Sequence, residues 1–189
     1  MLRRFTVGIG EFLTARLSDM PEKPAVSFAL PGAVTGKNAL SLYLCAMTED
    51  TQLRSNEKQY ELAGGVWVST QPPFRLKCTY IVSVWPGASD PSEAALVQQN
   101  ILSAAYCLIA TTATLPMAYL PSAMRGADLP KPVIAIADNE LSGRPEFWAS
   151  AGCAYRPSFS FTATVSLPFA AESYDHVVEG VQVDYKVNQ

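Results

Sequence analysis

The sequence predicts a single α+β domain, in which a mainly antiparallel or mixed β-sheet packs against an N-terminal helix and one long central helix. Two kinds of pattern lead to this prediction. Apolar residues recur at helical spacing in residues 5–20 and again after residue 90, whereas several other segments alternate apolar and polar residues with the period of a strand. The length of 189 residues suits one domain with a core of its own.

The first helix is predicted over residues 5–20, because its apolar side chains recur at helical spacing and charged residues lie between them. The helix should end at Met20, since Pro21 disfavours helical backbone in the residue before it. Residues 21–38 contain prolines and glycines around the short apolar run 25–30, which predicts one extended piece between turns. The apolar positions of the helix are Phe5, Ile9, Phe12, Leu13, Leu17 and Met20.

Four strands are expected in the next part of the chain. Residues 40–45 alternate leucine with serine, tyrosine and cysteine, and a polar run follows. Gly64 and Gly65 separate the short segments 60–63 and 66–69, which is typical of a β-hairpin. Residues 74–85 predict a long strand whose second half, with apolar residues on both faces, is covered on both sides.

The central helix should begin at Asp90, which can cap the helix, followed by Pro91 at the first helical position and Glu93 in the first turn. Its buried stripe is predicted to contain Val97, Ile101, Ala105 and Leu108, and the helix should end before Pro116. The proline-rich residues 116–132 predict a loop with one helical turn.

The remaining elements are two strands and a strand-like tail. Residues 132–138 predict a short apolar strand, and Phe147 and Trp148 are expected in a turn-rich link. Residues 158–167 alternate serine or threonine with apolar residues, which predicts a strand with one face exposed to water. We therefore divide the chain into a domain of residues 1–168 and a C-terminal extension of residues 169–189, where Val181, Val183, Tyr185 and Val187 alternate with polar residues.

The composition excludes several classes of protein. A net charge of −3 argues against a nucleic-acid partner and against a polybasic membrane patch. Charged residues make up only 16% of the chain, against about 25% in an average soluble domain, so part of the surface is expected to contact protein. Residues 94–124 carry no charge, but their polar residues and prolines argue against direct membrane insertion.

The four cysteines are predicted to be reduced and mostly buried, because their wide spacing fits neither a zinc site nor a redox motif. This usage is typical of a cytoplasmic protein. Gly8, Gly10 and Glu11 interrupt the apolar core that a secretion signal would need, so no such signal is expected.

Motifs for catalysis, cofactors and metals are weak throughout the chain. His176 is the only histidine and has no neighbouring nucleophile motif. Residues 32–38 resemble a phosphate loop but are one residue too short between the glycines, and Gly8 and Gly10 lack the third glycine of a dinucleotide site. The carboxylate pairs 49–50 and 138/140 are read as solvated charges, and Trp67, Trp85 and Trp148 as core or interface anchors. We predict no enzyme, no cofactor and no metal.

Four segments, taken in order, resemble a known family. They are residues 40–44 leading to Thr-Glu-Asp at 48–50 and Leu-Arg-Ser-Asn at 53–56, Pro-Pro-Phe-Arg-Leu at 72–76, the helix after Glu93, and Phe147 and Trp148 followed by Tyr-Arg-Pro-Ser at 155–158. Their order and spacing over residues 37–168 resemble the cap, or tail-terminator, family of phage-tail-like contractile injection systems. Phe147 stands where the family usually has leucine, and Ala154 replaces a common lysine. Residues 57–70 and the tail after Pro168 fall outside the shared pattern.

The resemblance implies a structural protein. Such a cap forms a ring, expected to be a hexamer, that closes the distal end of the inner tube and sheath and ends their polymerisation. Its partners would be other copies of itself, the sheath protein and the inner tube protein, in the bacterial cytoplasm as part of the assembled particle. The motif positions suggest interface roles for Arg54, Trp148, Tyr155 and Arg156, and we add the tail residues 181, 183, 185 and 187 from their alternation. The alternative is a ligand-binding or enzymatic α/β domain with an unrecognised site.

Overall fold

The computed structural model describes residues 1–35, 38–53, 57–63, 66–126, 129–138, 143–168 and 172–174. The helices are α1 (Leu2–Leu17), α2 (Pro91–Ala110) and α3 (Pro145–Ser150), and the short 3₁₀ turns are η1 (Pro31–Ala33), η2 (Thr51–Leu53), η3 (Met117–Tyr119) and η4 (Ser122–Met124). The strands are β1 (Ala25–Ser27), β2 (Ala39–Glu49), β3 (Gln59–Ala63), β4 (Val66–Thr70), β5 (Phe74–Trp85), β6 (Val133–Ala137), β7 (Ser158–Leu167) and β8 (Glu172–Tyr174).

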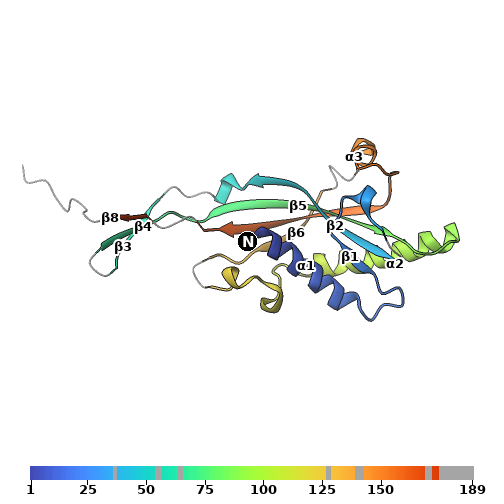
Figure 1. Ribbon diagram of the computed structural model, residues 1–189, viewed down its shortest axis with the longest axis horizontal. Coiled ribbons are helices and arrows are strands. Elements are labelled where there is room, and N and C mark those ends of the chain that lie inside the picture. Colours follow the sequence, from blue (N-terminus) through green and yellow to red (C-terminus); the bar gives the residue numbers. More distant parts are fainter. Residues whose placement is uncertain are drawn as a thin grey trace, which may run out of the picture.

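The main sheet has the strand order β1-β2-β5-β7-β6. β1 pairs parallel with β2, and the other neighbours in the sheet are antiparallel. Helices α1 and α2 lie on one side of this sheet, and the short α3 lies on the other (Figure 1). The predicted α+β fold, with a mixed sheet against an N-terminal and a central helix, is confirmed.

A second sheet, β3-β4-β8, extends from one end of the main sheet (Figure 1). β3 and β4 pair antiparallel, which confirms the predicted hairpin, although the two glycines themselves lie outside the described residues. β8 adds to β4 with Val68 opposite Ser173. Residues just beyond the proposed domain boundary at Pro168 thus continue the fold by pairing with the projecting hairpin.

The core lies between the sheet and the two long helices. Phe5, Ile9 and Leu13 of α1 are fully buried, as the helical spacing predicted. Across the sheet, the ring of Tyr80 stacks on Phe161 with centroids 5.0 Å apart, and its hydroxyl forms a 2.8 Å hydrogen bond with the hydroxyl of Thr6. Burial raises the pKa of the Tyr80 hydroxyl above its ordinary value, so it stays protonated and can keep this bond.

Helix α2 begins as the sequence predicted. The carboxylate of Asp90 accepts a 2.8 Å hydrogen bond from the backbone N–H of Glu93, and Pro91 occupies the first turn. Ile101, Ala105 and Ile109 are buried against the sheet. The loop after α2 contains two 3₁₀ turns, η3 and η4, where one helical turn was expected.

Two predictions about the C-terminal half are wrong. Phe147 and Trp148 lie in the short helix α3 and not in a turn-rich link, because Pro145 starts a helical turn and the fully buried Trp148 holds it in place. The serine and threonine face of β7 is less exposed than predicted, because Ser160 and Ser166 are buried while Thr162 and Thr164 are half-buried. Ser166 lies under groups from other parts of the chain, since it accepts a hydrogen bond from Arg75 and donates one to the Pro130 carbonyl.

The prediction that the cysteines are mostly buried is also wrong. All four are free, but only Cys78 is buried, while Cys45 and Cys153 are half-buried and Cys107 is exposed on α2. The presence of a cysteine does not by itself predict burial, because a cysteine on an amphipathic helix can lie on either face.

Candidate assembly surfaces

The structure brings three of the predicted interface residues together at one corner of the molecule. Trp148 belongs to α3, and Tyr155 and Arg156 follow in the link from α3 to β7. This corner, which we call the α3 corner, lies on the face of the sheet opposite to α1 and α2 (Figure 1). Arg54, Val181, Val183, Tyr185 and Val187 lie outside the described residues, as do His176 and Glu140.

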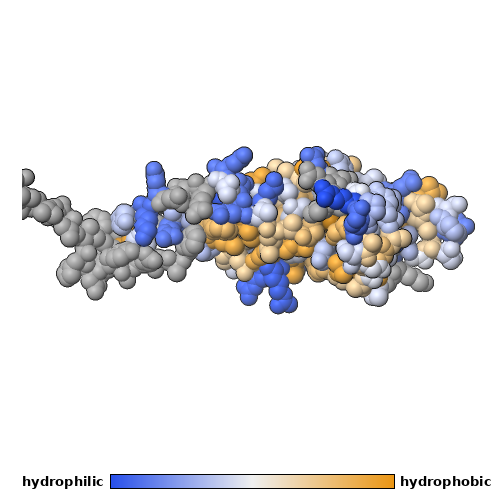
Figure 2. Space-filling view, turned by 90° about the horizontal axis from the view of Figure 1, so that it is seen from above, coloured by the Kyte–Doolittle hydropathy of each residue, from blue (hydrophilic) through white to orange (hydrophobic). Residues whose placement is uncertain are grey.

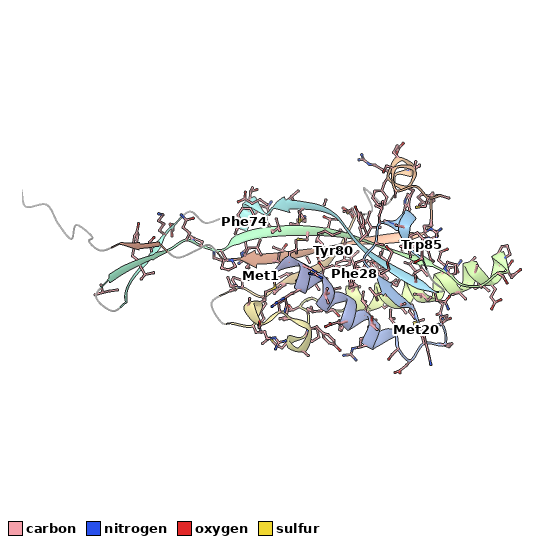
Figure 3. All side chains as sticks on the ribbon, in the orientation of Figure 1. Met1, Met20, Phe28, Phe74, Tyr80 and Trp85 are labelled. Carbon is pink, nitrogen blue, oxygen red and sulfur yellow. The ribbon has the colours of Figure 1, made fainter. Side chains whose placement is uncertain are left out.

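Arg156 ties the link to the end of β5. Its guanidinium lies 4.0 Å from the centroid of the Trp85 ring, and its Nη1 donates a 3.0 Å hydrogen bond to the carbonyl of Val84. Its Nε is buried and has no hydrogen-bond partner among the described residues. Burial lowers the pKa of the guanidinium, partly opposed by Cys153, but the group remains charged because an arginine starts from such a high value. Figure 3 shows Trp85 at the end of β5 on this side of the molecule.

Aromatic rings build the rest of the α3 corner. The Trp148 ring is fully buried and meets Phe147 and Tyr155 edge to face, with centroids 5.3 and 6.3 Å away. Tyr155 itself is 61% exposed, so the corner presents a phenol ring held from below by a buried indole. The backbone of η1 approaches the end of α3 closely, since a Cβ added at Gly32 would lie 1.9 Å from the Ala151 carbonyl oxygen.

Two further surfaces escaped the sequence analysis. The first is a groove of about 310 Å³ between α1 and the edge strand β1, which we call the α1–β1 groove. Its lining is apolar apart from Glu11 and Thr14, and Phe28, which is 44% exposed, forms one wall (Figure 3). Gly10 makes this packing possible, because a Cβ there would lie 2.5 Å from the Phe28 ring. Gly8 and Gly10, within the helical pattern of residues 5–20, were the sequence signal that could have indicated this groove.

The second surface is the outer face of α2, formed by exposed residues with no charge among them. We use the name α2 outer face for Leu96, Gln99, Ser103, Tyr106, Cys107 and Ala110. Seen from the α3 side, apolar residues also gather across the middle of the molecule (Figure 2). The uncharged run after Glu93 was the sequence signal for the α2 outer face.

A polar hollow of about 380 Å³ lies where α1 leads into β1, between Glu22, Asn38 and Glu93. Glu22 accepts a 2.8 Å hydrogen bond from Asn100 of α2, and the Asn38 amide bridges the Glu22 carbonyl and the Gly87 N–H. This hollow therefore joins α1, α2 and the end of β5. Within the described ranges, no three acidic, histidine or cysteine side chains are grouped so that they could hold a metal ion. No helix in the described part of the chain is both long and apolar enough to cross a membrane.

Comparison with known proteins decides the family. The Pvc16 N-terminal domain matches residues 6–178. The chain belongs to the Pvc16 N-terminal domain family. This confirms the resemblance to injection-system caps, and the match reaches further than the sequence motifs did, since it includes most of α1 and the beginning of the C-terminal extension. No curated protein matches the chain.

Two solved structures share this fold. One is the sheath/tube terminator, in its extended state, of the extracellular contractile injection system PVC, with a TM-score of 0.65 and 21% identity over 100% of this chain and 64% of that one. The other is the tube-terminating cap of the anti-feeding prophage, with a TM-score of 0.62 and 22% identity over 95% of this chain and 59% of that one. The chain thus spans less than two thirds of either protein.

Proposed function

We propose that this protein is the cap, or tail terminator, of a contractile injection system, which closes the distal end of the inner tube and sheath and ends their polymerisation. The observation that supports this most is the match to the Pvc16 N-terminal domain over residues 6–178. Two solved structures with this fold are named as terminators, and neither is named as an enzyme. In this proposal the chain acts by assembly.

The protein works as a ring. A terminator must contact the last ring of the tube and sheath and must offer no surface on which another ring can add. A closed cyclic assembly of one chain would match the ring on which it sits, since head-to-tail contacts close at a fixed copy number, and its outer side would offer no surface for stacking. By family resemblance, the copy number is six and the contacts on either side are the sheath and inner tube proteins. The chain would assemble in the bacterial cytoplasm and remain part of the finished particle.

The α3 corner contributes one contact surface in this proposal. Tyr155 supplies an exposed aromatic ring, and Arg156 has a buried Nε that a partner acceptor could approach only with a small movement of the link. Trp148 is buried within the protomer, so its part is to hold Tyr155 in position. Arg54 is proposed to act at the same assembly step, on the strength of its motif position alone.

The test is electron microscopy of particles made without this protein. If it terminates assembly, tubes and sheaths should become long and variable in length, and a plasmid copy of the chain should restore a single length. The Tyr155→Ala variant should keep a folded core, because the Tyr155 side chain is largely exposed. Normal, uniform tubes and sheaths in the deletion strain would contradict the proposed function.

The C-terminal extension has a separate role in this proposal. Residues 181–187 alternate Val181, Val183, Tyr185 and Val187 with polar residues, and a lone strand needs a partner edge to become ordered. We assign this segment to an edge of a neighbouring copy or of the sheath, where it adds main-chain hydrogen bonds. Truncation after residue 174 keeps β8 and should leave folding intact but impair attachment. A truncated protein that folds and assembles normally would remove this role.

A further inference from the structure

The sheet β3-β4-β8, which we call the arm, has an open strand edge. β3 pairs with β4 on one side, and within the described part of the chain no strand pairs with its other side. Tyr60 and Leu62 lie on the same face of β3, and each is 57% exposed. Proteins often block such an edge with a proline or a bulge, because it would pair with another chain. β3 has five residues, no proline and no register shift against β4, so its edge can receive another strand.

The other sheet edges offer less room for an added strand. β1, at one edge of the main sheet, has three residues. At the opposite edge, the backbone N–H of Ile134 in β6 already donates a 2.8 Å hydrogen bond to the Ala113 carbonyl in the loop after α2. β8, at the other edge of the arm, also has only three residues. The edge of β3 is therefore the best candidate among the described strands.

The C-terminal extension leaves the described structure level with this edge. Tyr174, the last residue of β8, is opposite Trp67 of β4, and Trp67 is opposite Leu62 of β3. Neighbouring strands lie about 4.8 Å apart, so the backbones at Tyr174 and Leu62 are about 10 Å apart across the arm. The arm points away from the main sheet (Figure 1). The extension therefore starts close to the β3 edge and away from β1 and β6.

The length and pattern of the extension suit this edge. Residues 175–180 lead from Tyr174 to the alternating segment 181–187 and can span up to about 25 Å when extended. The alternation gives the segment one apolar face and one polar face, as an added edge strand requires. When its apolar face lies beside Tyr60 and Leu62, the added strand enlarges one continuous apolar face of the arm. The extension thus has the reach and the pattern to pair with β3.

We infer that residues 181–187 of one copy add as a strand to the β3 edge of the next copy in the ring. Copies in a ring are related by rotation about one axis, so the next copy's β3 lies at the same height along this axis as the chain's own β3. The extension starts about 10 Å from its own β3, so it has to move mainly sideways to reach the next arm. The next copy offers the same edge as the chain itself, so the exchange loses no contact and links the copies. This inference rests on the proposed ring and names the edge that receives the extension.

A photo-crosslinker tests the pairing in particles that contain the full chain. With p-benzoylphenylalanine in place of Tyr185, irradiation should give an adduct of twice the mass of the chain, in which position 185 is joined to the peptide that contains residues 59–63. The same probe in place of Leu62 should label the peptide that contains residues 181–187. The probe in place of Met47 is the matched control, since Met47 is 56% exposed on β2, and it should not label the extension.

The position of the adduct distinguishes the possible occupants of the β3 edge. An adduct within a single chain would overturn the exchange, because each extension would then pair with its own arm. An adduct between position 185 and the sheath or tube protein would overturn the inference by assigning the extension to that partner. Absence of an adduct from both probe positions would show that the extension does not lie on β3. In all three cases the proposed function stands if particles made without the chain lose length control. It fails, whatever the adduct shows, if their length is unchanged.

Incorporation of variants into particles gives an independent measurement. Leu62→Asp and truncation after residue 174 should each reduce incorporation by about fivefold or more, because each removes one side of the same strand contact. The two changes together should reduce it no further than truncation alone, since changes at one shared contact are not additive. Met47→Asp is the control and should be incorporated normally. Circular dichroism of the purified chains checks that they fold. A further loss when Leu62→Asp is added to the truncated chain would contradict the inference, because β3 would then contact a different partner.

Discussion

Replacing Arg156 with alanine tests whether one side chain holds the α3 corner to the sheet. The change removes the hydrogen bond to the Val84 carbonyl and the contact with the Trp85 ring. A hydrogen bond from a charged donor contributes about 1.5–3 kcal/mol, and a cation–π contact about 0.5–2 kcal/mol depending on its burial. The guanidinium loses hydration when it is buried, which offsets part of this sum, so we expect a net loss of about 2–3 kcal/mol.

Thermal unfolding followed by circular dichroism measures this loss. One kcal/mol shifts the melting temperature of a domain of this size by about 2–4 °C, so Arg156→Ala should melt about 4–12 °C below the parent chain. Arg156→Lys keeps the charge but not the planar group that stacks and donates together, and should recover only part of the loss. Lys77→Ala, which removes an exposed cation from β5, is the control and should be nearly neutral. Melting of Arg156→Ala within 1 °C of the parent chain, or full rescue by lysine, would refute the reasoning.

Three further predictions concern packing, capping and thiol reactivity. Gly8→Ala should destabilise the chain by about 1–3 kcal/mol despite the better helix propensity of alanine, because the new Cβ would lie 2.0 Å from the Tyr119 carbonyl oxygen. Gly126→Ala is the control and should leave stability unchanged, since open space surrounds Gly126. Equal melting temperatures of the two variants would exclude the contact. Asp90→Ala should lower the free energy of unfolding, measured with denaturant, by about 1 kcal/mol because it removes the cap of α2. Asp90→Asn should retain most of the capping energy. At pH 8 a maleimide should label Cys107 rapidly and Cys78 only after unfolding, because burial raises the pKa of the Cys78 thiol to about 11; equal labelling rates in the native protein would contradict the buried position.

The pKa of Cys78 also implies a direction for stability against pH. The thiol ionises near 9 in the unfolded chain and near 11 in the fold, so the unfolded state loses its proton first as the pH rises. The protonated thiol therefore favours the fold fully below pH 9, and this contribution declines between pH 9 and 11.

The sequence by itself determined the two long helices and most of the strands of this protein. The apolar spacing in α1, the Asp90 cap of α2 and the alternation in β5 are local signals, because each depends on neighbours within a few residues and on the regular geometry of a helix or strand. The Gly-Gly hairpin between β3 and β4 belongs to the same class. The order of four motifs was also enough to indicate the family.

Only the tertiary structure decided which faces are covered and which residues meet. The serines of β7 look solvent-facing in sequence, yet Ser160 and Ser166 are buried, and Ser166 bonds to Arg75 and to the Pro130 carbonyl from distant parts of the chain. Arg156 meets Val84 and Trp85, more than seventy residues earlier, through packing that no local pattern encodes. The same reason applies to the α1–β1 groove and the α2 outer face. Burial is a property of how elements stack in space, so the sequence could show that α2 lacks charge but not which side of it the rest of the protomer leaves uncovered.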